Sequence, residues 1–388
     1  MNNKIILIFG LMVAIILLYV YKTSSPPHPQ VNNVAPQNGP QFPDSWPNNP
    51  PEEQPPKEFT FAEALNSINL QDIKSNLEYL ASEKLEGRMS GKKGNILAAQ
   101  MIYDKFKSYG LNVEYQKFRI SRMNPGPHNE TGDDFTQNII AWIEGSELPN
   151  EIVVIGAHMD HIGYGPRMSR SGRIAIHPGA DDNASGTVAL LEIAKAFSKL
   201  KPKRTVVFQA YSAEEMGLIG SRFYCDHPLF PKENPNIRNH IFMLNMDMVG
   251  YLGKGQHFAG FYSGDSSPDV GRLIDELNAK YSFARRVTSR GSGGSDHACF
   301  YNKRVPVAFL HTGSHPYYHT PEDTADKINY QGIEQIARYA FELSWRVAND
   351  PYTVRFNHAE FEPMPYTHDH GHPEVPFPHS YHQHPHEH

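Results

Sequence analysis

Cysteine is scarce in this 388-residue chain, and two motifs of common hydrolases are missing. The two cysteines, Cys225 and Cys299, are too few for a disulfide framework or a cysteine-based zinc site; they could pair with each other or remain buried thiols. No G-x-S-x-G sequence occurs, which disfavours serine-hydrolase chemistry. The H-E-x-x-H sequence of helical zinc proteases is also missing. The formal charge of −6 comes without a long charged run, so nucleic acid is not an expected partner.

Both ends of the chain are poor in core-forming residues, which explains a hydrophobic content of only 39%. Residues 1–22 contain an almost wholly apolar run, Ile5 to Tyr21, which at about 1.5 Å per residue approaches the thickness of a bilayer core. No A-x-A cleavage site follows it, so we expect an N-terminal membrane anchor rather than a cleaved signal segment. The rest of the chain is then expected outside the cytoplasm, in the cell envelope, or secreted if the segment is cleaved.

The composition divides the remainder into three regions. Residues 23–57 hold eleven prolines in 35 positions, which predicts an extended, disordered linker. Residues 58–350 are expected to form the folded domain, and residues 351–388 a disordered tail rich in proline and histidine. Eight histidines lie from His368 to His388, and imidazoles in a flexible chain bind divalent metals weakly. The tail is therefore either a gathering site for extra divalent ions or a solvated end.

Strand patterns alternate with helical patterns within residues 58–350, which predicts an α/β fold. We expect a three-layer sandwich in which helices flank a mostly parallel central sheet. The run at 152–157 is apolar throughout, as is typical of a strand buried on both faces. The other predicted strands are 112–118, 138–143, 205–211, 241–246 and 305–310, and the main predicted helices are 94–109, 185–199, 268–280 and 330–349.

Residues able to bind a metal or move a proton follow several of these strands. Ligands bind beyond the carboxyl ends of strands in open α/β sheets, so His158 and Asp160 leave the sheet where chemistry is expected. Asp160 can hold the second ring nitrogen of His158 and fix its tautomer. Adjacent carboxylates such as Glu214 and Glu215 diverge, so one can bind a metal while the other serves as general base. Asp247, set among apolar residues, is costly unless paired or coordinated.

Several motifs together resemble one known family. Gly-Ala-Asp181-Asp182-Asn-Ala-Ser-Gly, Glu214-Glu215, Asn-Met-Asp247 and Tyr-His319-Thr-Pro are similar to the secreted di-zinc aminopeptidases, the group of bacterial leucyl-type aminopeptidases and aminopeptidase Y. The motifs occur in the order of that family, and Leu85-Glu86-Gly87-Arg88 resembles its entry segment. The resemblance covers about residues 77–349.

The resemblance implies a site with two zinc ions per chain. It makes Asp181 the carboxylate that bridges the ions, and it implies a cis peptide bond between Asp181 and Asp182. Glu214 would be the general base, with Asp160 supporting His158. Tyr318 resembles a tyrosine that steadies the tetrahedral intermediate in some members, although it could equally be a packed aromatic. The implied metal ligands are His158, Asp181, Glu215, Asp247 and His319.

The implied function is zinc-dependent removal of N-terminal residues from peptides with a free N-terminus. Nitrogen and oxygen ligands suit zinc, and Mn²⁺ or Co²⁺ could substitute. The alternatives are a related carboxypeptidase or aminoacylase-type di-zinc hydrolase, and a non-catalytic envelope protein that binds metal. The presence of Glu214 argues against the last alternative, because metal storage needs ligands but no general base.

Three further features receive minor roles. His161 follows the opening motif but matches no ligand of the family, so we expect it to pack structurally. Ser295-Asp296-His297 is expected to form the wall of the site or to support its ligands, rather than to bind metal itself. The insertion at 162–176, which contains Arg170, is expected to be a solvated loop, although its arginines could meet a substrate carboxylate.

Overall fold

The computed structural model describes residues 58–120, 135–166, 168–253, 260–262, 266–283, 294–359, 361–364 and 366. They belong to the compact unit Lys57–His388. The predicted anchor, the linker and the histidine-rich segment from His368 onward lie outside the described residues. Of the helices in the described ranges, none is both long and apolar enough to cross a membrane.

The strands form one mixed sheet in the order β1-β2-β4-β3-β5-β7-β6. Its four central strands, β4, β3, β5 and β7, are parallel, whereas β1, β2 and β6 join the sheet through antiparallel pairing. The mostly parallel centre therefore matches the predicted sheet. The strands are β1 (Asn112–Arg119), β2 (Phe135–Ile143), β3 (Leu148–His158), β4 (Arg204–Tyr211), β5 (His240–Met246), β6 (Gly260–Tyr262) and β7 (Val307–His311).

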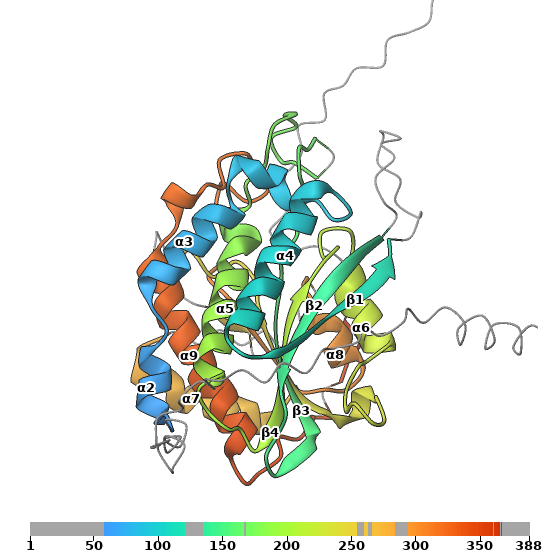
Figure 1. Ribbon diagram of the computed structural model, residues 1–388, viewed down its shortest axis with the longest axis vertical. Coiled ribbons are helices and arrows are strands. Elements are labelled where there is room, and N and C mark those ends of the chain that lie inside the picture. Colours follow the sequence, from blue (N-terminus) through green and yellow to red (C-terminus); the bar gives the residue numbers. More distant parts are fainter. Residues whose placement is uncertain are drawn as a thin grey trace, which may run out of the picture. The chain divides into compact units, whose positions relative to one another are not determined.

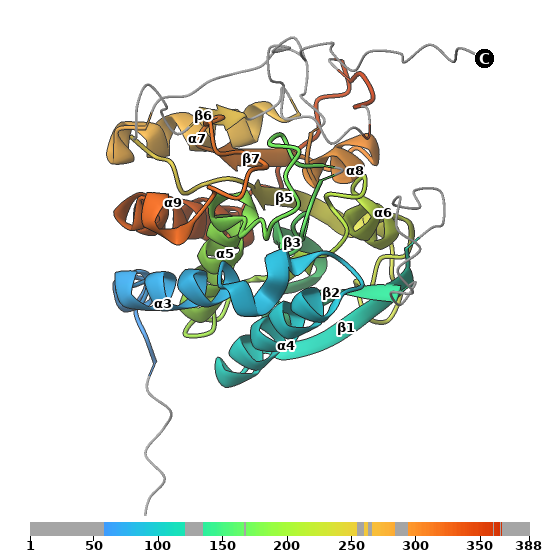
Figure 2. The ribbon, with the colours of Figure 1, turned by 90° about the horizontal axis from the view of Figure 1, so that it is seen from above.

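Helices cover both faces of the sheet (Figures 1 and 2). One face carries α2 (Phe61–Asn66), α3 (Leu70–Leu80), α4 (Lys93–Ser108), α5 (Gly186–Phe197), α7 (Pro268–Tyr281) and α9 (Tyr330–Asn349). The opposite face carries α6 (Ile219–Asp226) and α8 (His297–Asn302). The predicted three-layer α/β sandwich is confirmed. Short helical turns occur at η1 (Glu83–Arg88), η2 (Ala180–Ser185), η3 (Ile237–Asn239) and η4 (Ala325–Lys327).

Strand β3 is buried on both faces, as its continuous apolar run predicts. Val153, Ile155 and Ala157 belong to the core under the larger helical layer, whereas Ile152 and Val154 belong to the core under α6 and α8. This alternation follows from the two-residue period of a strand. Because parallel strands flank β3 on both sides, its carboxyl end lies in the middle of the sheet edge.

The helix starts are specified locally by capping side chains. Asn69 accepts a hydrogen bond from Asp72 N at the start of α3, and Asn329 does the same from Gly332 N at the start of α9. Ser267 caps α7, where Pro268 occupies the first turn and has no N–H to leave unpaired. These caps explain why the predicted starts of α7 and α9 agree with the observed ones.

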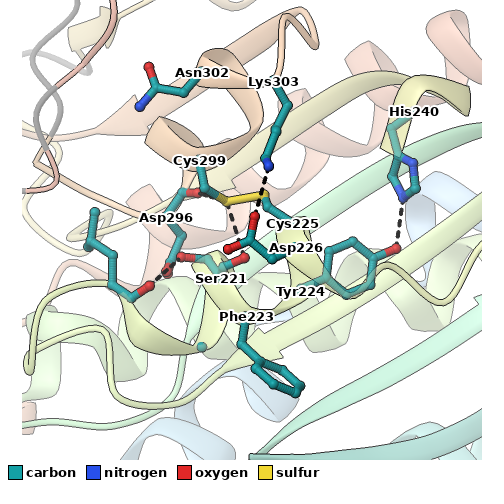
Figure 3. Close-up of a disulfide and its surroundings, with 12 residues drawn as sticks. Ser221, Phe223, Tyr224, Cys225, Asp226, His240, Asp296, Cys299, Asn302 and Lys303 are labelled. Atoms are coloured by element: carbon teal, nitrogen blue, oxygen red, sulfur yellow. Dashed lines mark hydrogen bonds and ion pairs between the residues drawn. A yellow bond between two sulfur atoms is a disulfide. The ribbon is translucent and has the colours of Figure 1, made fainter. Parts of the chain in front are cut away.

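A disulfide between Cys225 and Cys299 joins α6 to α8 (Figure 3). The sequence left this pairing open, because the two residues are 74 positions apart and neither neighbourhood reveals the other. An ion pair at the ends of the same helices, Lys303 Nζ to Asp226 Oδ1 at 2.8 Å, adds a second link. The thinner helical layer is therefore tied together covalently.

Packing continues past α9 into the region predicted as tail. Val354 and Met364 are buried, and the rings of Phe356 and Phe361 lie about Tyr301 of α8 at 5.5 and 5.6 Å between centroids. Hence the predicted boundary at residue 350 lies inside a packed region: these aromatic side chains cover α8, which the sequence pattern did not predict.

Candidate metal centre

The first cluster of ligands, called here the strand-end group, consists of His158, Asp182 and Asp247. His158 ends β3 and Asp247 directly follows β5, so the parallel pairing of these strands brings the two side chains together. The Nε2 atom of His158 lies 3.2 Å from Oδ1 of Asp247 and 3.4 Å from Oδ1 of Asp182. All three residues are buried. They therefore present one nitrogen and two carboxylates to a common point.

The second cluster, called here the loop group, consists of His161, Asp182, Glu215 and His319. Apart from Asp182, its members stand three, four and eight residues beyond the ends of β3, β4 and β7. The Nε2 atom of His319 lies 3.0 Å from Oδ2 of Asp182 and 3.1 Å from Oε2 of Glu215. His161 Nδ1 lies 2.7 Å from the other Glu215 oxygen, Oε1. The two groups share Asp182, which turns Oδ1 to one and Oδ2 to the other.

Asp182, rather than Asp181, belongs to both groups. The carboxylate of Asp181 accepts a hydrogen bond from Gly250 N at 2.6 Å and lies 3.0 Å from His315 Nε2, so it faces away from both groups. Asp182 leaves the helical path of η2, with φ −105° and ψ 94°, and this turns neighbouring side chains in different directions. The cis peptide bond accordingly joins Asp182 to Asn183, one position later than expected. Nothing in the Asp-Asp sequence distinguishes its two members.

The chemistry of the two groups fits a pair of metal ions. Both carboxylate oxygens of Asp182 are buried, and each faces an imidazole nitrogen, Oδ1 that of His158 and Oδ2 that of His319. A buried carboxylate is costly unless it is paired or coordinates a metal. Imidazole nitrogens and carboxylate oxygens are the ligands expected of zinc, and each group offers at least the three that a catalytic zinc site requires.

Glu214 stands on the side of the strand-end group. Its Oε2 lies 3.9 Å from Nε2 of His158, and its backbone N–H donates to Oδ1 of Asp160 at 3.2 Å. The same Asp160 oxygen lies 3.7 Å from Nδ1 of His158. Asp160 therefore contacts both His158 and the backbone of Glu214, which follows the end of β4. All three residues are buried.

Arg88 joins the segments that carry the ligands. Its guanidinium is fully buried and donates to the carbonyl oxygens of Leu80 at 2.6 Å, Met159 at 3.0 Å, Pro178 at 2.6 Å and Gly179 at 2.8 Å. Burial lowers the pKa of Arg88 to about 10, with nearby carboxylates opposing this effect, so the group remains a cation at neutral pH. One side chain therefore fixes the spacing between the exit of β3 and the start of η2.

Ser295 and Thr187 form hydrogen bonds with residues of the strand-end group. Ser295 donates to Oδ2 of Asp247 at 2.7 Å and itself accepts from the amide of Asn245 at 2.7 Å. Thr187 of α5 donates to the carbonyl oxygen of His158 at 2.8 Å. Ser295 therefore fixes one oxygen of Asp247 and leaves the other facing His158. This is the kind of support that was expected from the Ser295 segment.

The insertion at 162–176 contacts the loop that carries His319. The carbonyl oxygen of Met168 lies 3.0 Å from His319 Nδ1, and the N–H of Arg170 donates to the carbonyl of His319 at 2.9 Å. Tyr318 is buried and stacks on the His319 ring, with 3.9 Å between centroids. The exposed Arg170 lies over Tyr318, 4.8 Å from the ring centroid. The described part of the insertion is thus partly exposed, with exposed residues at 164, 170 and 172–174, but it also contacts His319.

The pKa values of the site residues are shifted by the carboxylates that lie close together there. Burial alone would lower the pKa of His319, but the carboxylates of Glu215 and Asp182 outweigh it and raise the pKa to about 9. For His158, burial is likewise outweighed by Asp247 and Glu214, so its pKa lies well above the ordinary value. Burial, reinforced by Asp182, holds the pKa of Tyr318 well above its usual range. Tyr318 therefore keeps its proton at neutral pH and can donate a hydrogen bond.

Three features of the centre were not predicted from the sequence: the place of Asp182 in both groups, the place of His161 in the loop group, and the backbone contacts of Arg88. His161 carried a weak signal, because a second imidazole three residues after His158 leaves the same strand end. Arg88 carried none, since its partners are backbone carbonyls that any sequence supplies.

Comparison with known proteins agrees with this arrangement. The chain belongs to peptidase family M28, whose model matches residues 138–344. A probable leucine aminopeptidase from Trichophyton verrucosum (strain HKI 0517) is 32% identical over 214 residues, which cover 52% of this chain and 55% of that protein. Leupeptin-inactivating enzyme 1 of Streptomyces exfoliatus is 29% identical over 252 residues, 64% of this chain and 50% of the relative. The chain thus spans about half the length of these curated relatives.

A solved structure extends the likeness to the fold. The zinc aminopeptidase BSAP from Bacillus subtilis superimposes with a TM-score of 0.60 at 19% identity, covering 73% of this chain and 96% of that one. The resemblance to the di-zinc aminopeptidases that the sequence motifs indicated is therefore confirmed for family and fold.

Proposed function

We propose that this protein is a zinc-dependent aminopeptidase that hydrolyses the N-terminal residue from peptides. The observation that carries the proposal is the pair of ligand groups that share Asp182, with Glu214 standing beside one of them. Two ions held about 3.5–4 Å apart would polarise the scissile carbonyl and supply an activated water. The relatives named as aminopeptidases, and the solved zinc aminopeptidase of the same fold, support this choice.

The residues divide the work according to their positions. The proposed ligands are His158, Asp182 and Asp247 for one ion, and Asp182, Glu215 and His319 for the other. Asp182 takes the bridging role that the sequence resemblance gave to Asp181. Mn²⁺ and Co²⁺ remain candidates for the same ligands.

Glu214 is the proposed general base. Its carboxylate faces the strand-end group without belonging to either set of ligands, so it can take a proton from water and return it to the leaving amine. Asp160 positions it through the Glu214 N–H and also faces His158. Tyr318, whose raised pKa keeps the hydroxyl protonated, is proposed to donate a hydrogen bond to the oxyanion.

The charge of the site favours a substrate with a free amino group. Besides the proposed metal ligands Asp182, Glu215 and Asp247, the acid Glu214 is buried at this edge of the sheet. Such surroundings attract a cationic N-terminus. A carboxypeptidase or aminoacylase-type activity is the second candidate, because Arg170 beside Tyr318 could meet a substrate carboxylate. A purely metal-binding role leaves Glu214 without a purpose.

We further propose that the protein acts outside the cytoplasm, held by its N-terminal apolar segment or secreted after its removal. The Cys225–Cys299 disulfide supports this location, since disulfides persist in oxidising compartments. The histidine-rich segment from His368 is proposed only as an auxiliary site for divalent ions.

The test compares two adjacent acids. Glu214→Gln should keep its zinc but lower kcat on aminoacyl amides by about 10²–10⁴-fold, because it removes proton transfer alone. Glu215→Gln should lose zinc as well, because it removes a ligand. Zinc is measured by elemental analysis of the purified protein. The wild type should cleave substrates with a free N-terminus and spare N-blocked ones; cleavage of blocked substrates only would replace the aminopeptidase with the second candidate.

A further inference from the structure

We propose that His161 is a fourth protein ligand of the ion in the loop group, so that the two ions of the centre are unequal. This inference rests on the proposed two-metal function and adds a ligand that the sequence resemblance does not supply. It makes the loop group the tighter site and leaves the open coordination position on the ion of the strand-end group.

The first support is the convergence of four side chains. Nδ1 of His161 lies 2.7 Å from Oε1 of Glu215 and 3.6 Å from Oδ2 of Asp182. These side chains and His319 each offer a ligand atom such that all four atoms lie within 4.8 Å of one another. The His161 and His319 rings approach edge to face, 5.5 Å apart at an interplanar angle of 77°, so both imidazoles aim a nitrogen at the carboxylates between them.

The second support is that the backbone makes room for this ring. Gly179 has φ +58°, and a Cβ at this position would stand 2.5 Å from Cγ of His161. Only glycine therefore lets the imidazole lie against the start of η2. The backbone N–H of His161 in turn donates to the backbone carbonyl of Arg88 at 3.4 Å. This bond links His161 to the residue whose side chain joins the ligand-bearing segments. His161 is buried and fixed from both sides.

The third support is the position of the general base. Zinc sites closed by four protein ligands are typical of structural ions, whereas catalytic ions have three and an open position. With His161 included, the loop group supplies four and the strand-end group three. Glu214 approaches the strand-end group, 3.9 Å from Nε2 of His158. The proton acceptor thus stands at the ion that retains space for water.

A competing role for His161 is a hydrogen bond from Nδ1–H that merely positions Glu215. Two substitutions separate these roles. His161→Ala removes both ligation and hydrogen bonding. His161→Asn places an amide N–H the same number of bonds from Cα as Nδ1, so it keeps a donor for Glu215 while removing the imidazole lone pair.

The experiment measures zinc affinity without using turnover. The full chain is stripped with a chelator, and zinc is returned in competition with a chromophoric chelator. The wild-type centre should show a tight and a weaker step, both tighter than the weak binding proposed for the histidine-rich segment from His368. Loss of a residue that only supports a ligand costs about 10–100-fold in metal affinity. Both variants should therefore weaken the tight step by more than about 100-fold and leave the weaker step in place.

Controls keep the result interpretable. His240→Asn removes another buried imidazole, from the opposite end of β5, and should leave both steps unchanged. Circular dichroism of the zinc-free variants checks that each one folds. Co²⁺ in place of zinc gives visible bands that depend on the ligand set, and the band of the tight site should change in both His161 variants.

Two outcomes overturn the inference: a His161→Asn variant that binds zinc as the wild type does, or two equal steps in the wild type. Peptidase activity is assayed separately on the same wild-type sample. A protein that binds two unequal zinc ions but cleaves nothing would contradict the proposed function and leave the role of His161 intact.

Discussion

The two ligand groups are built by different means although they share one carboxylate. The strand-end group takes its histidine from the last residue of β3 and an aspartate from the position after β5, so the sheet itself sets their separation. The loop group takes its other ligands from three connections that continue well beyond the sheet. Those connections are held by contacts between loops, such as Met168 with His319. A rigid sheet fixes one half of the centre, and packed loops must fix the other half.

The largest effect should come from the residue common to both groups. Asp182→Asn weakens a ligand of each ion, so we expect the zinc held by the centre to fall toward zero and hydrolysis to become undetectable. Asp181→Asn is the matched control, because its side chain can still accept from Gly250 N and lies outside both groups. Elemental analysis and turnover of an aminoacyl amide measure the two variants. A greater loss of zinc and of turnover in Asp181→Asn than in Asp182→Asn would assign the bridging role to Asp181. The definition of the two groups by a shared Asp182 would then be wrong.

An intermediate effect should fall on the strand-end group alone. Ser295→Ala removes the hydrogen bond that orients Asp247, and loss of such support costs about 10–100-fold in metal affinity. The ion of the loop group should keep its affinity, because Ser295 contacts none of its ligands in the hydrogen bonds described. Ser266→Ala removes a buried serine bonded to the backbone of Val307 instead and should alter neither ion. Equal weakening of both zinc steps would mean that the groups are coupled rather than separately supported.

The most gradual effect is a pH dependence of zinc binding by the loop group. The pKa of His319 is raised to about 9, so in the metal-free protein this imidazole carries a proton at pH 7 that must leave before zinc binds. Apparent affinity should therefore rise by about tenfold per pH unit from pH 7 and level off near pH 9. Zinc titrations of a His158→Ala variant, whose strand-end group is broken, isolate this dependence. A flat profile over this range would show that His319 is already neutral at pH 7.

The parts of the fold and site that the sequence predicts are mostly those set by the strands, whereas the parts set by loops were mostly not predicted. The α/β sandwich, the strands and His158, Asp247 and the Glu214-Glu215 pair could be predicted, because buried strands have a strong apolar pattern and their ends point to one sheet edge. The choice between Asp181 and Asp182 could not, since it depends on backbone angles within η2.

The loop contributions were harder for the same physical reason. His161 and the insertion at 162–176 acquire their roles from partners distant in sequence, and no periodic pattern encodes such contacts. The short helix α8 and the disulfide beside it likewise depend on tertiary packing. Six residues of helix are too few for a distinct amphipathic pattern.

Arg88 has a consequence for how this candidate metal centre can be divided. Arg88 and its neighbour Ser90, which accepts from the N–H of Ala213 at 2.7 Å, both precede the segment 138–344 that the family model matches. A chain cut down to that segment would retain the proposed ligands and the base, yet the exits of β3 and β4 and the start of η2 would lose the donors and acceptors that align them. The segment 138–344 alone therefore lacks contacts that align the centre. Any transplant to another scaffold, or any shortening of this one, has to carry the N-terminal helices with it.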